Sequence, residues 1–296
     1  MAGFFGFFDY TKPGKGVRKD EPDKTGVALY LEIFFKRFWK LVSLNIFYLI
    51  ASIPAIIIGW YISTYFLAFS AAYAGLNLEE TATSLTILGI MMTVVLLQVC
   101  GSGAATTAMS YVVRKYVNDT HSWVWADFVD NIKSNFVQGT IVYVINILIT
   151  VMCLFSILFY TFVLKVSFAP IMKVLVLVIL CVFSAMQMYT YQLMAGFELK
   201  VRHIYKNSLL LTLAKLPWNV LTVAVTLFIM YGCYSLGMYT PVAGAVILGA
   251  LYFTFIPFTQ IFMTNNIVKK YILNPFMEEN ASDEEEREEA AFEDVG

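Results

Sequence analysis

Six long apolar runs constrain the fold of this sequence more than any other feature. A helix needs about 20 apolar residues to cross roughly 30 Å of hydrocarbon, and each run is about that long or longer. The runs cover residues 41–67, 85–112, 137–164, 171–197, 219–237 and 242–264. A membrane β-barrel would need polar and apolar residues to alternate, and in these runs they do not. The sequence therefore predicts an all-α polytopic membrane protein with six transmembrane helices.

Composition supports a membrane location. Of the 296 residues, 59% are hydrophobic and 14% are charged, whereas a soluble domain typically has about 25% charged residues. The formal net charge of −1 combines two opposite parts, because residues 278–296 carry ten acidic residues and one arginine. The rest of the chain is basic, as expected for a protein that faces an anionic inner leaflet. A block of like charge without an apolar face predicts a disordered acidic tail over 276–296.

The distribution of Lys and Arg predicts the orientation. About sixteen of them lie in the segments on one side of the apolar runs, and two, Lys165 and Lys173, lie on the other side. Short loops rich in Lys and Arg stay in the cytoplasm. We therefore expect a multi-pass protein of the plasma membrane with both termini in the cytoplasm.

A short pattern occurs three times and suggests an internal repeat. It consists of an apolar residue, a lysine, two variable residues and an aromatic residue, at 35–39, 132–136 and 214–218. We call these segments the lysine–aromatic motifs. Each precedes a pair of apolar runs that ends in a basic cluster, at 113–115, 201–203 or 268–270. The repetition predicts three membrane hairpins, each preceded by an interfacial amphipathic helix.

These hairpins define the expected domain organisation. A cytosolic N-terminal segment covers 1–24, the membrane domain covers 25–275, and the tail covers 276–296. The repeat units of the membrane domain are about 25–118, 119–207 and 208–275.

The segments before each hairpin, 25–40, 119–135 and 208–215, are too polar or too short to cross a membrane. In 119–135, Asp119 or Thr120 is expected to cap a helix. Its apolar residues recur at helical spacing, and they are Trp125, Phe128, Val129, Ile132 and Phe136. Such a helix is expected to lie in the headgroup plane, with aromatic side chains inserted and lysines reaching the phosphates.

The lysine–aromatic motifs supply the candidate partner contacts. These are Lys36, Trp39, Lys133, Phe136, Lys215 and Trp218. Cytosolic helices between spans dock a soluble subunit in some membrane complexes and only anchor the bundle in others, and the motifs are compatible with both roles. A stretch of eight small residues, 101–108, predicts a close contact between helices. The candidate helix-packing residues in it are Gly101, Gly103, Ala104 and Ala105.

Glu198 is the one acidic residue at the edge of an apolar run, and it is the candidate intramembrane polar site. An ionisable group inside a membrane suggests a proton or cation site. The alternative is local pairing with Lys200 and Arg202 at headgroup level. The polar residues of the runs either line a solute path or form interhelical hydrogen bonds. They are Asn45, Gln98, Asn146, Gln187, Gln192, Asn219 and Gln260.

No pattern in the sequence is typical of an enzyme or a cofactor site. Ser, His and Asp never occur in a spacing that suggests a triad, and HExxH and ATP-binding motifs are absent. The four cysteines lie in apolar runs, with spacing that fits neither zinc nor a redox pair. We therefore expect no catalytic, cofactor-binding or metal-binding residues and no binding of nucleic acid.

The N-terminal region resembles a known family. Phe4-Phe5-Gly6-Phe7-Phe8-Asp9-Tyr10, the segments 12–17 and 20–22, and the stretch 34–45 are similar to the YesL-like family. That family comprises uncharacterised multi-spanning proteins of low-GC Gram-positive bacteria, and the resemblance is strongest over residues 3–60. The resemblance implies a link to carbohydrate uptake, since genes of the family often neighbour those for sugar-importing ABC transporters.

The chain lacks the cytosolic loop of the Glu-Ala-Ala type through which importer permeases dock their ATPase. We therefore expect an accessory or assembly subunit of a carbohydrate ABC importer, with importer subunits and membrane lipids as partners. The alternative is an autonomous small-solute transporter or channel.

Overall fold

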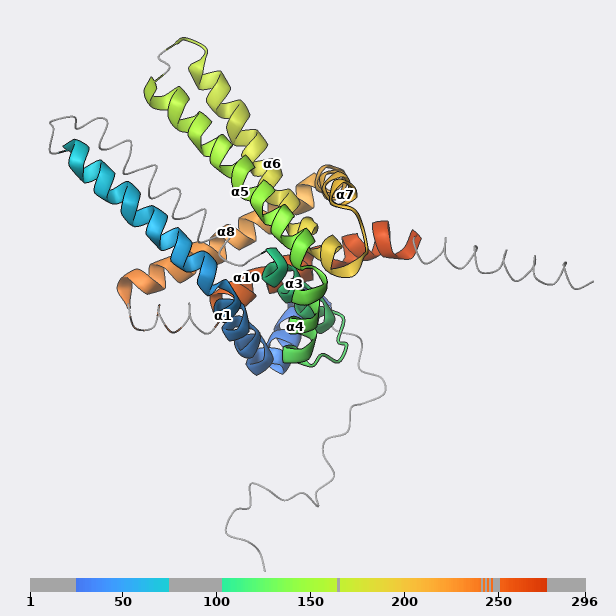
Figure 1. Ribbon diagram of the computed structural model, residues 1–296. Coiled ribbons are helices and arrows are strands. Elements are labelled where there is room, and N and C mark those ends of the chain that lie inside the picture. Colours follow the sequence, from blue (N-terminus) through green and yellow to red (C-terminus); the bar gives the residue numbers. More distant parts are fainter. Residues whose placement is uncertain are drawn as a thin grey trace, which may run out of the picture. The chain divides into compact units, whose positions relative to one another are not determined.

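The computed structural model describes residues 25–74, 103–163, 166–240, 242, 244, 246 and 251–275. Every regular element in these residues is a helix, which confirms the all-α prediction (Figure 1). The elements are α1 (Gly26–Ala74), α3 (Gly103–Val117), α4 (Val124–Ser134), α5 (Phe136–Leu158), the π-helical turn η1 (Phe159–Val163), α6 (Ala169–Gly196), α7 (Val201–Ala214), α8 (Leu216–Tyr239), α10 (Phe253–Val268) and the π-helical turn η3 (Lys269–Leu273).

Among the described residues, three helices are long and apolar enough to cross a membrane. They cover Phe136–Thr161, Ala169–Gly196 and Leu216–Cys233, and they overlap the predicted spans 137–164, 171–197 and 219–237. Three such helices are typical of an integral membrane protein. Of the other predicted spans, 41–67 lies within α1, whereas 85–112 and 242–264 fall partly outside the described residues.

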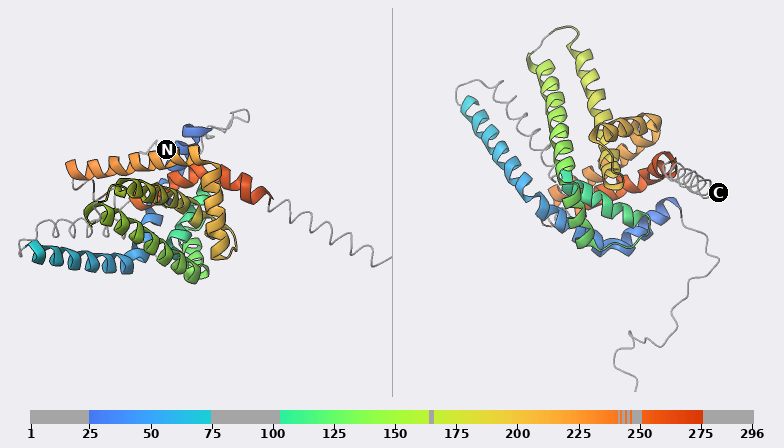
Figure 2. Two further views of the ribbon diagram at one scale, coloured as in Figure 1. Left: turned by 90° about the horizontal axis from the view of Figure 1, so that it is seen from above. Right: turned by 45° about the vertical axis from the view of Figure 1, so that its right-hand side comes forward.

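Helices α5 and α6 form a hairpin and lie side by side (Figure 2). The chain enters α6 through a turn in which Ala169 N–H donates to the carbonyl of Val166 at 3.0 Å. Pro170 stands in the first turn of α6, where its missing N–H costs no hydrogen bond. Large apolar side chains on both helices are exposed in the isolated protein, and a surrounding bilayer would cover them.

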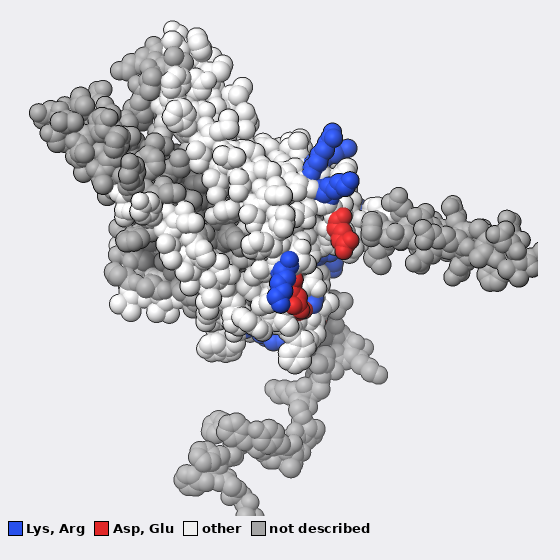
Figure 3. Space-filling view, viewed as in Figure 1, with Lys and Arg blue, Asp and Glu red and all other residues white. Residues whose placement is uncertain are grey.

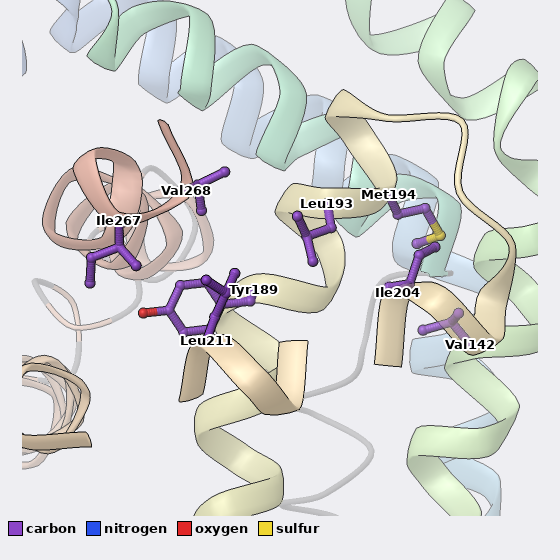
Figure 4. Packing of buried hydrophobic residues seen from close by; sticks show 8 residues of the cluster. All are labelled: Val142, Tyr189, Leu193, Met194, Ile204, Leu211, Ile267 and Val268. Atoms are coloured by element: carbon purple, nitrogen blue, oxygen red, sulfur yellow. The ribbon is translucent and has the colours of Figure 1, made fainter. Parts of the chain in front are cut away.

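The hydrophobic core lies where α5, α6, α7 and α10 meet. Eight buried residues form one cluster, seen from close by in Figure 4: Val142, Tyr189, Leu193, Met194, Ile204, Leu211, Ile267 and Val268. Helix α3 packs against α4, α5, α6 and α10. It therefore joins the short helix α4 to the α5–α6 hairpin and to the C-terminal helix.

The predicted helix cap at Asp119 or Thr120 is wrong. Helix α4 begins at Val124, and no side chain caps it. Asp119 instead takes a positive φ of 50°, and Thr120 N–H donates to the carbonyl of Lys115 at 2.9 Å. A residue in the left-handed region just after a helix is a common C-terminal cap. These two residues therefore end α3 and do not start α4.

The apolar face of α4 is only partly available to lipid. Phe128 is 2% exposed and lies 6.4 Å, between ring centroids, from Phe47 of α1. Trp125 remains 62% exposed. The sequence pattern identified the apolar face correctly. Part of this face does not contact lipid, because it packs against α3 and α1.

The helix boundaries differ from those expected near two other motifs. Residues 26–74 form one helix, α1, without a boundary between the predicted segments 25–40 and 41–67. Residues 208–214 of the predicted segment 208–215 form the last part of α7, which already begins at Val201, and Lys215 follows the helix. The basic cluster 201–203 is therefore the first turn of α7.

Candidate functional site

Two helix bends in the described residues share one local geometry. Asn135 separates α4 from α5 with φ −104° and ψ 13°, and Lys215 separates α7 from α8 with φ −122° and ψ 37°. Each N–H donates to the carbonyl four residues earlier, and each carbonyl accepts from the N–H four residues later. One residue thus changes the helix direction while the hydrogen-bond ladder continues across it.

The lysine–aromatic motifs and the bends align different residues with each other. The motif pairs Lys133 with Lys215, whereas the backbone geometry pairs Asn135 with Lys215. Lys133 is exposed in the last turn of α4. The Lys215 ammonium lies 5.2 Å from the centre of the Tyr271 ring, where a cation–π contact is favourable. The two lysines therefore have different surroundings.

The aromatic residues of the motifs are partly or largely exposed. Trp39 is 78%, Phe136 56% and Trp218 45% exposed. The Trp218 indole Nε1 donates to the carbonyl of Met263 in α10 at 2.8 Å, which attaches the start of α8 to α10. Lys36 lies in α1. The structure thus distributes the six candidate partner contacts over α1, the Asn135 bend and the Lys215 bend.

The small-residue stretch lies at a close helix crossing. Gly103, Ala104 and Ala105 of α3 are buried, and Gly101 lies outside the described residues. A Cβ built on Gly103 would overlap the carbonyl of Gly139 in α5. Gly139 lies outside the predicted small-residue stretch, although a glycine inside a helical pattern often has a packing reason.

A half-buried polar cluster around the buried Asn146 joins α5, α6 and α7. The amide of Asn146 in α5 donates to Gln187 Oε1 at 2.6 Å and to the Tyr191 hydroxyl at 3.1 Å, both in α6. The hydroxyl of Tyr205 in α7 donates to Asn146 Oδ1 at 2.6 Å. Burial raises the pKa of Tyr205 to about 12, so the hydroxyl keeps its proton at neutral pH. We call these four residues the Asn146 cluster; the sequence singled out Asn146 and Gln187 but neither tyrosine.

Other polar residues of the apolar runs also bond between helices. Asn219 of α8 accepts from the Tyr189 hydroxyl at 2.5 Å and donates to the carbonyl of Thr212 in α7 at 2.9 Å. Gln192 of α6 donates to Thr264 Oγ1 of α10 at 2.8 Å. Asn45 of α1 accepts from the N–H of Thr254 at 3.1 Å. Each bond satisfies a polar group that would be costly to leave unpaired in hydrocarbon.

Charged residues gather near the end of α3 and over α7, and the face of the α5–α6 hairpin in Figure 3 shows none. Arg37 pairs with Asp119 at 3.0 Å, and Lys115 pairs with Asp127 at 3.0 Å. The Arg114 guanidinium carbon lies 5.5 Å from the centre of the Phe197 ring, and burial lowers the pKa of Arg114.

Glu198 lies in the connection that follows α6, two residues after Gly196, and its side chain is exposed. The structure does not bring it together with the Asn146 cluster. In the part of the chain that the structure describes, no group of three or more His, Cys, Asp or Glu residues could hold a metal ion.

Comparison with known proteins gives one family match. The family described as "Protein of unknown function, DUF624" matches residues 83–157. Within the described residues this range covers α3, α4 and all of α5 except Leu158. No curated protein and no solved structure matched the chain.

Proposed function

We propose that this chain is an accessory or assembly subunit of a carbohydrate ABC importer in the plasma membrane. It would have six spans in three hairpins, both termini in the cytoplasm, and no enzymatic activity. The resemblance of residues 3–60 to the YesL-like family supplies the link to carbohydrate uptake. The match to an uncharacterised family is compatible with membership in that group.

The observation that carries the proposal is the pair of helix bends. Lys133 and Phe136 flank the Asn135 bend, and both side chains are exposed. Aromatic side chains such as Phe136 are enriched at protein interfaces relative to the rest of the surface, and the Lys133 ammonium beside it can pair with an acidic group of a partner. A single-residue bend holds such a pair at a fixed angle to a membrane-length helix. The same backbone geometry at Lys215 offers a second contact of this kind.

The test is a crosslinked pull-down of the full chain from native membranes after growth on a complex polysaccharide. The wild-type chain should recover permease or ATPase subunits of a sugar importer. The double variant Lys133→Ala/Phe136→Ala should lose most of this recovery. These positions are preferable to Lys215 and Trp218, which contact Tyr271 and Met263 within the fold.

A matched control replaces exposed side chains away from the bends, with Phe155→Ala on α5 and Phe228→Ala on α8. It should recover importer subunits as the wild type does. If the wild-type chain recovered no importer subunit under mild detergent, the accessory role would have to be abandoned.

A second candidate function is an autonomous small-solute transporter, and the Asn146 cluster favours it. Neutral hydrogen-bonding groups between α5, α6 and α7 are of the kind that binds a polar, uncharged solute. Solute flux in vesicles that contain the purified protein, measured with and without Gln187→Leu, tests this function. Equal flux through both proteins would remove the cluster as a solute site.

A further inference from the structure

Helix α7 is held at a membrane boundary by the helices on either side. It follows the membrane-length helix α6 after four residues, 197–200, and Lys215 alone separates it from α8, which contains another membrane-length segment. With 14 residues at 1.5 Å each, α7 spans about 21 Å, less than the roughly 30 Å of hydrocarbon. Both ends of α7 must therefore lie at the same membrane surface.

The inward face of α7 fixes the rotation of this helix. Ile204 and Leu211 belong to the hydrophobic core cluster (Figure 4). Ser208 is buried and accepts from Thr190 Oγ1 of α6 at 3.2 Å. Because these contacts occupy one side of the helix, the opposite side has to face the membrane boundary.

The outward face has two chemically different halves. The first half carries the exposed residues Arg202 and Lys206, and exposed Lys200 precedes it. Figure 3 shows Lys and Arg side chains over this part of the molecule. The second half carries exposed leucines, Leu209, Leu210 and Leu213. The helix contains no acidic residue, and within the described residues no ion pair engages these three cations.

We propose that the outward face of α7 binds anionic phospholipid. In this arrangement Lys200, Arg202 and Lys206 contact headgroup phosphates, and Leu209, Leu210 and Leu213 enter the adjacent acyl layer. Basic residues near a membrane surface attract anionic lipids, and an interfacial helix buries its apolar side chains at the headgroup–acyl boundary. The protein therefore binds anionic lipid in preference to zwitterionic lipid, at a site that α7 defines.

The leucines favour lipid over an acidic peptide as the occupant. A polar acidic segment, such as residues 278–289 of this chain, would neutralise the cations and leave three adjacent leucines exposed to water. A phospholipid satisfies both halves of the face with one molecule, because its phosphate and its acyl chains are covalently joined. Because α7 lies between two membrane-length helices, the phospholipids of the bilayer are next to it.

The test uses the full chain, purified in a neutral detergent and titrated with short-chain phosphatidylglycerol or phosphatidylcholine. Bound lipid is counted by native mass spectrometry. Phosphatidylglycerol should bind more tightly, and higher salt should weaken it. Arg202→Gln/Lys206→Gln should reduce phosphatidylglycerol affinity by on the order of tenfold and leave phosphatidylcholine affinity unchanged.

A matched control, Lys173→Gln/Lys270→Gln, removes two cations that lie outside α7, in α6 and η3, and should change the affinity less than about twofold. Equal losses in both double variants would overturn the assignment of the site to α7. A chain that ends at Pro275 tests the acidic tail as occupant. If removal of the tail raised phosphatidylglycerol affinity severalfold, the tail and not lipid would be the occupant of α7 in the full chain.

Discussion

Gly103 of α3 and Gly139 of α5 bring two helix backbones into direct contact. A Cβ on Gly139 would lie 2.5 Å from the backbone nitrogen and 2.8 Å from the Cα of Ala104. Distances this short require the backbones to move apart. The contact joins α3 to the membrane-length helix α5, and no side chain at either glycine position would fit it.

Gly139→Ala should therefore destabilise the fold by about 3 kcal/mol, at the upper end of the cost of overpacking. The measurement is the free energy of unfolding in mixed micelles. Gly232→Ala in α8 is the control, since a Cβ there meets no heavy atom within 4 Å, and its effect should range from neutral to a stabilisation of about 1 kcal/mol. Equal effects of the two substitutions would contradict the close crossing.

Asp127 connects α4 to the end of α3, and it predicts a loss of stability in acid. Its carboxylate accepts from Lys115 Nζ at 3.0 Å, Ser122 Oγ at 2.6 Å and Trp123 N–H at 3.1 Å. Burial alone would raise the pKa of Asp127, but the hydrogen bonds from Ser122 and Lys115 outweigh burial and lower it.

A lowered pKa means that the folded state stabilises the ionised carboxylate. The contribution of Asp127 is complete above the ordinary aspartate pKa of about 4 and disappears as pH falls through the lowered value. Asp127→Asn should cost about 1 kcal/mol at pH 7, and the difference from wild type should vanish in strong acid. A pH series of unfolding measurements on both proteins checks this. A difference that did not depend on pH would show that the charge of Asp127 contributes nothing.

The Asn146 cluster should contribute measurably to the packing of α5, α6 and α7. Asn146→Leu removes the bonds to Gln187, Tyr191 and Tyr205. Since hydrogen bonds between membrane helices contribute about 0.6 kcal/mol each on average, we expect a loss of about 2 kcal/mol in the free energy of unfolding. The control is Asn266→Leu at an exposed position of α10, for which we expect less than about 0.5 kcal/mol.

If α5 and α6 cross the membrane as a hairpin, the turn between them is accessible from outside the cell, and α7, which follows α6, is accessible only from the cytoplasm. Ser167, in the turn before α6, and Lys206, in α7, are both exposed, and each is replaced by a single cysteine in a separate variant. In a protein whose native cysteines are replaced, an impermeant maleimide applied outside intact cells should label position 167 and not position 206. Disruption of the cells should make both positions reactive. If both were labelled before disruption, α5 and α6 would not cross the membrane in the expected orientation.

The apolar runs predicted the helices well because length and hydropathy are local properties. Contacts between residues far apart in the chain were harder to predict from the sequence. The pattern in 119–135 identified Phe128 as apolar, but only the fold shows that Phe47 covers it. Asp119 was a plausible helix cap by residue type, yet it adopts the left-handed conformation that ends α3. Two of the three lysine–aromatic motifs lie at the bends, whereas the first, 35–39, lies inside the continuous helix α1. The two motifs at the bends are two positions out of register with each other, because the backbone geometry makes Asn135, and not Lys133, equivalent to Lys215.

The single residue between α7 and α8 has a mechanical consequence. Lys215 offers two rotatable backbone bonds, and hydrogen bonds on both sides of it further restrict them. A lipid composition that draws α7 deeper into the leaflet must therefore also change the tilt of α8. The depth of α7 in the leaflet and the tilt of α8 would in this way change together.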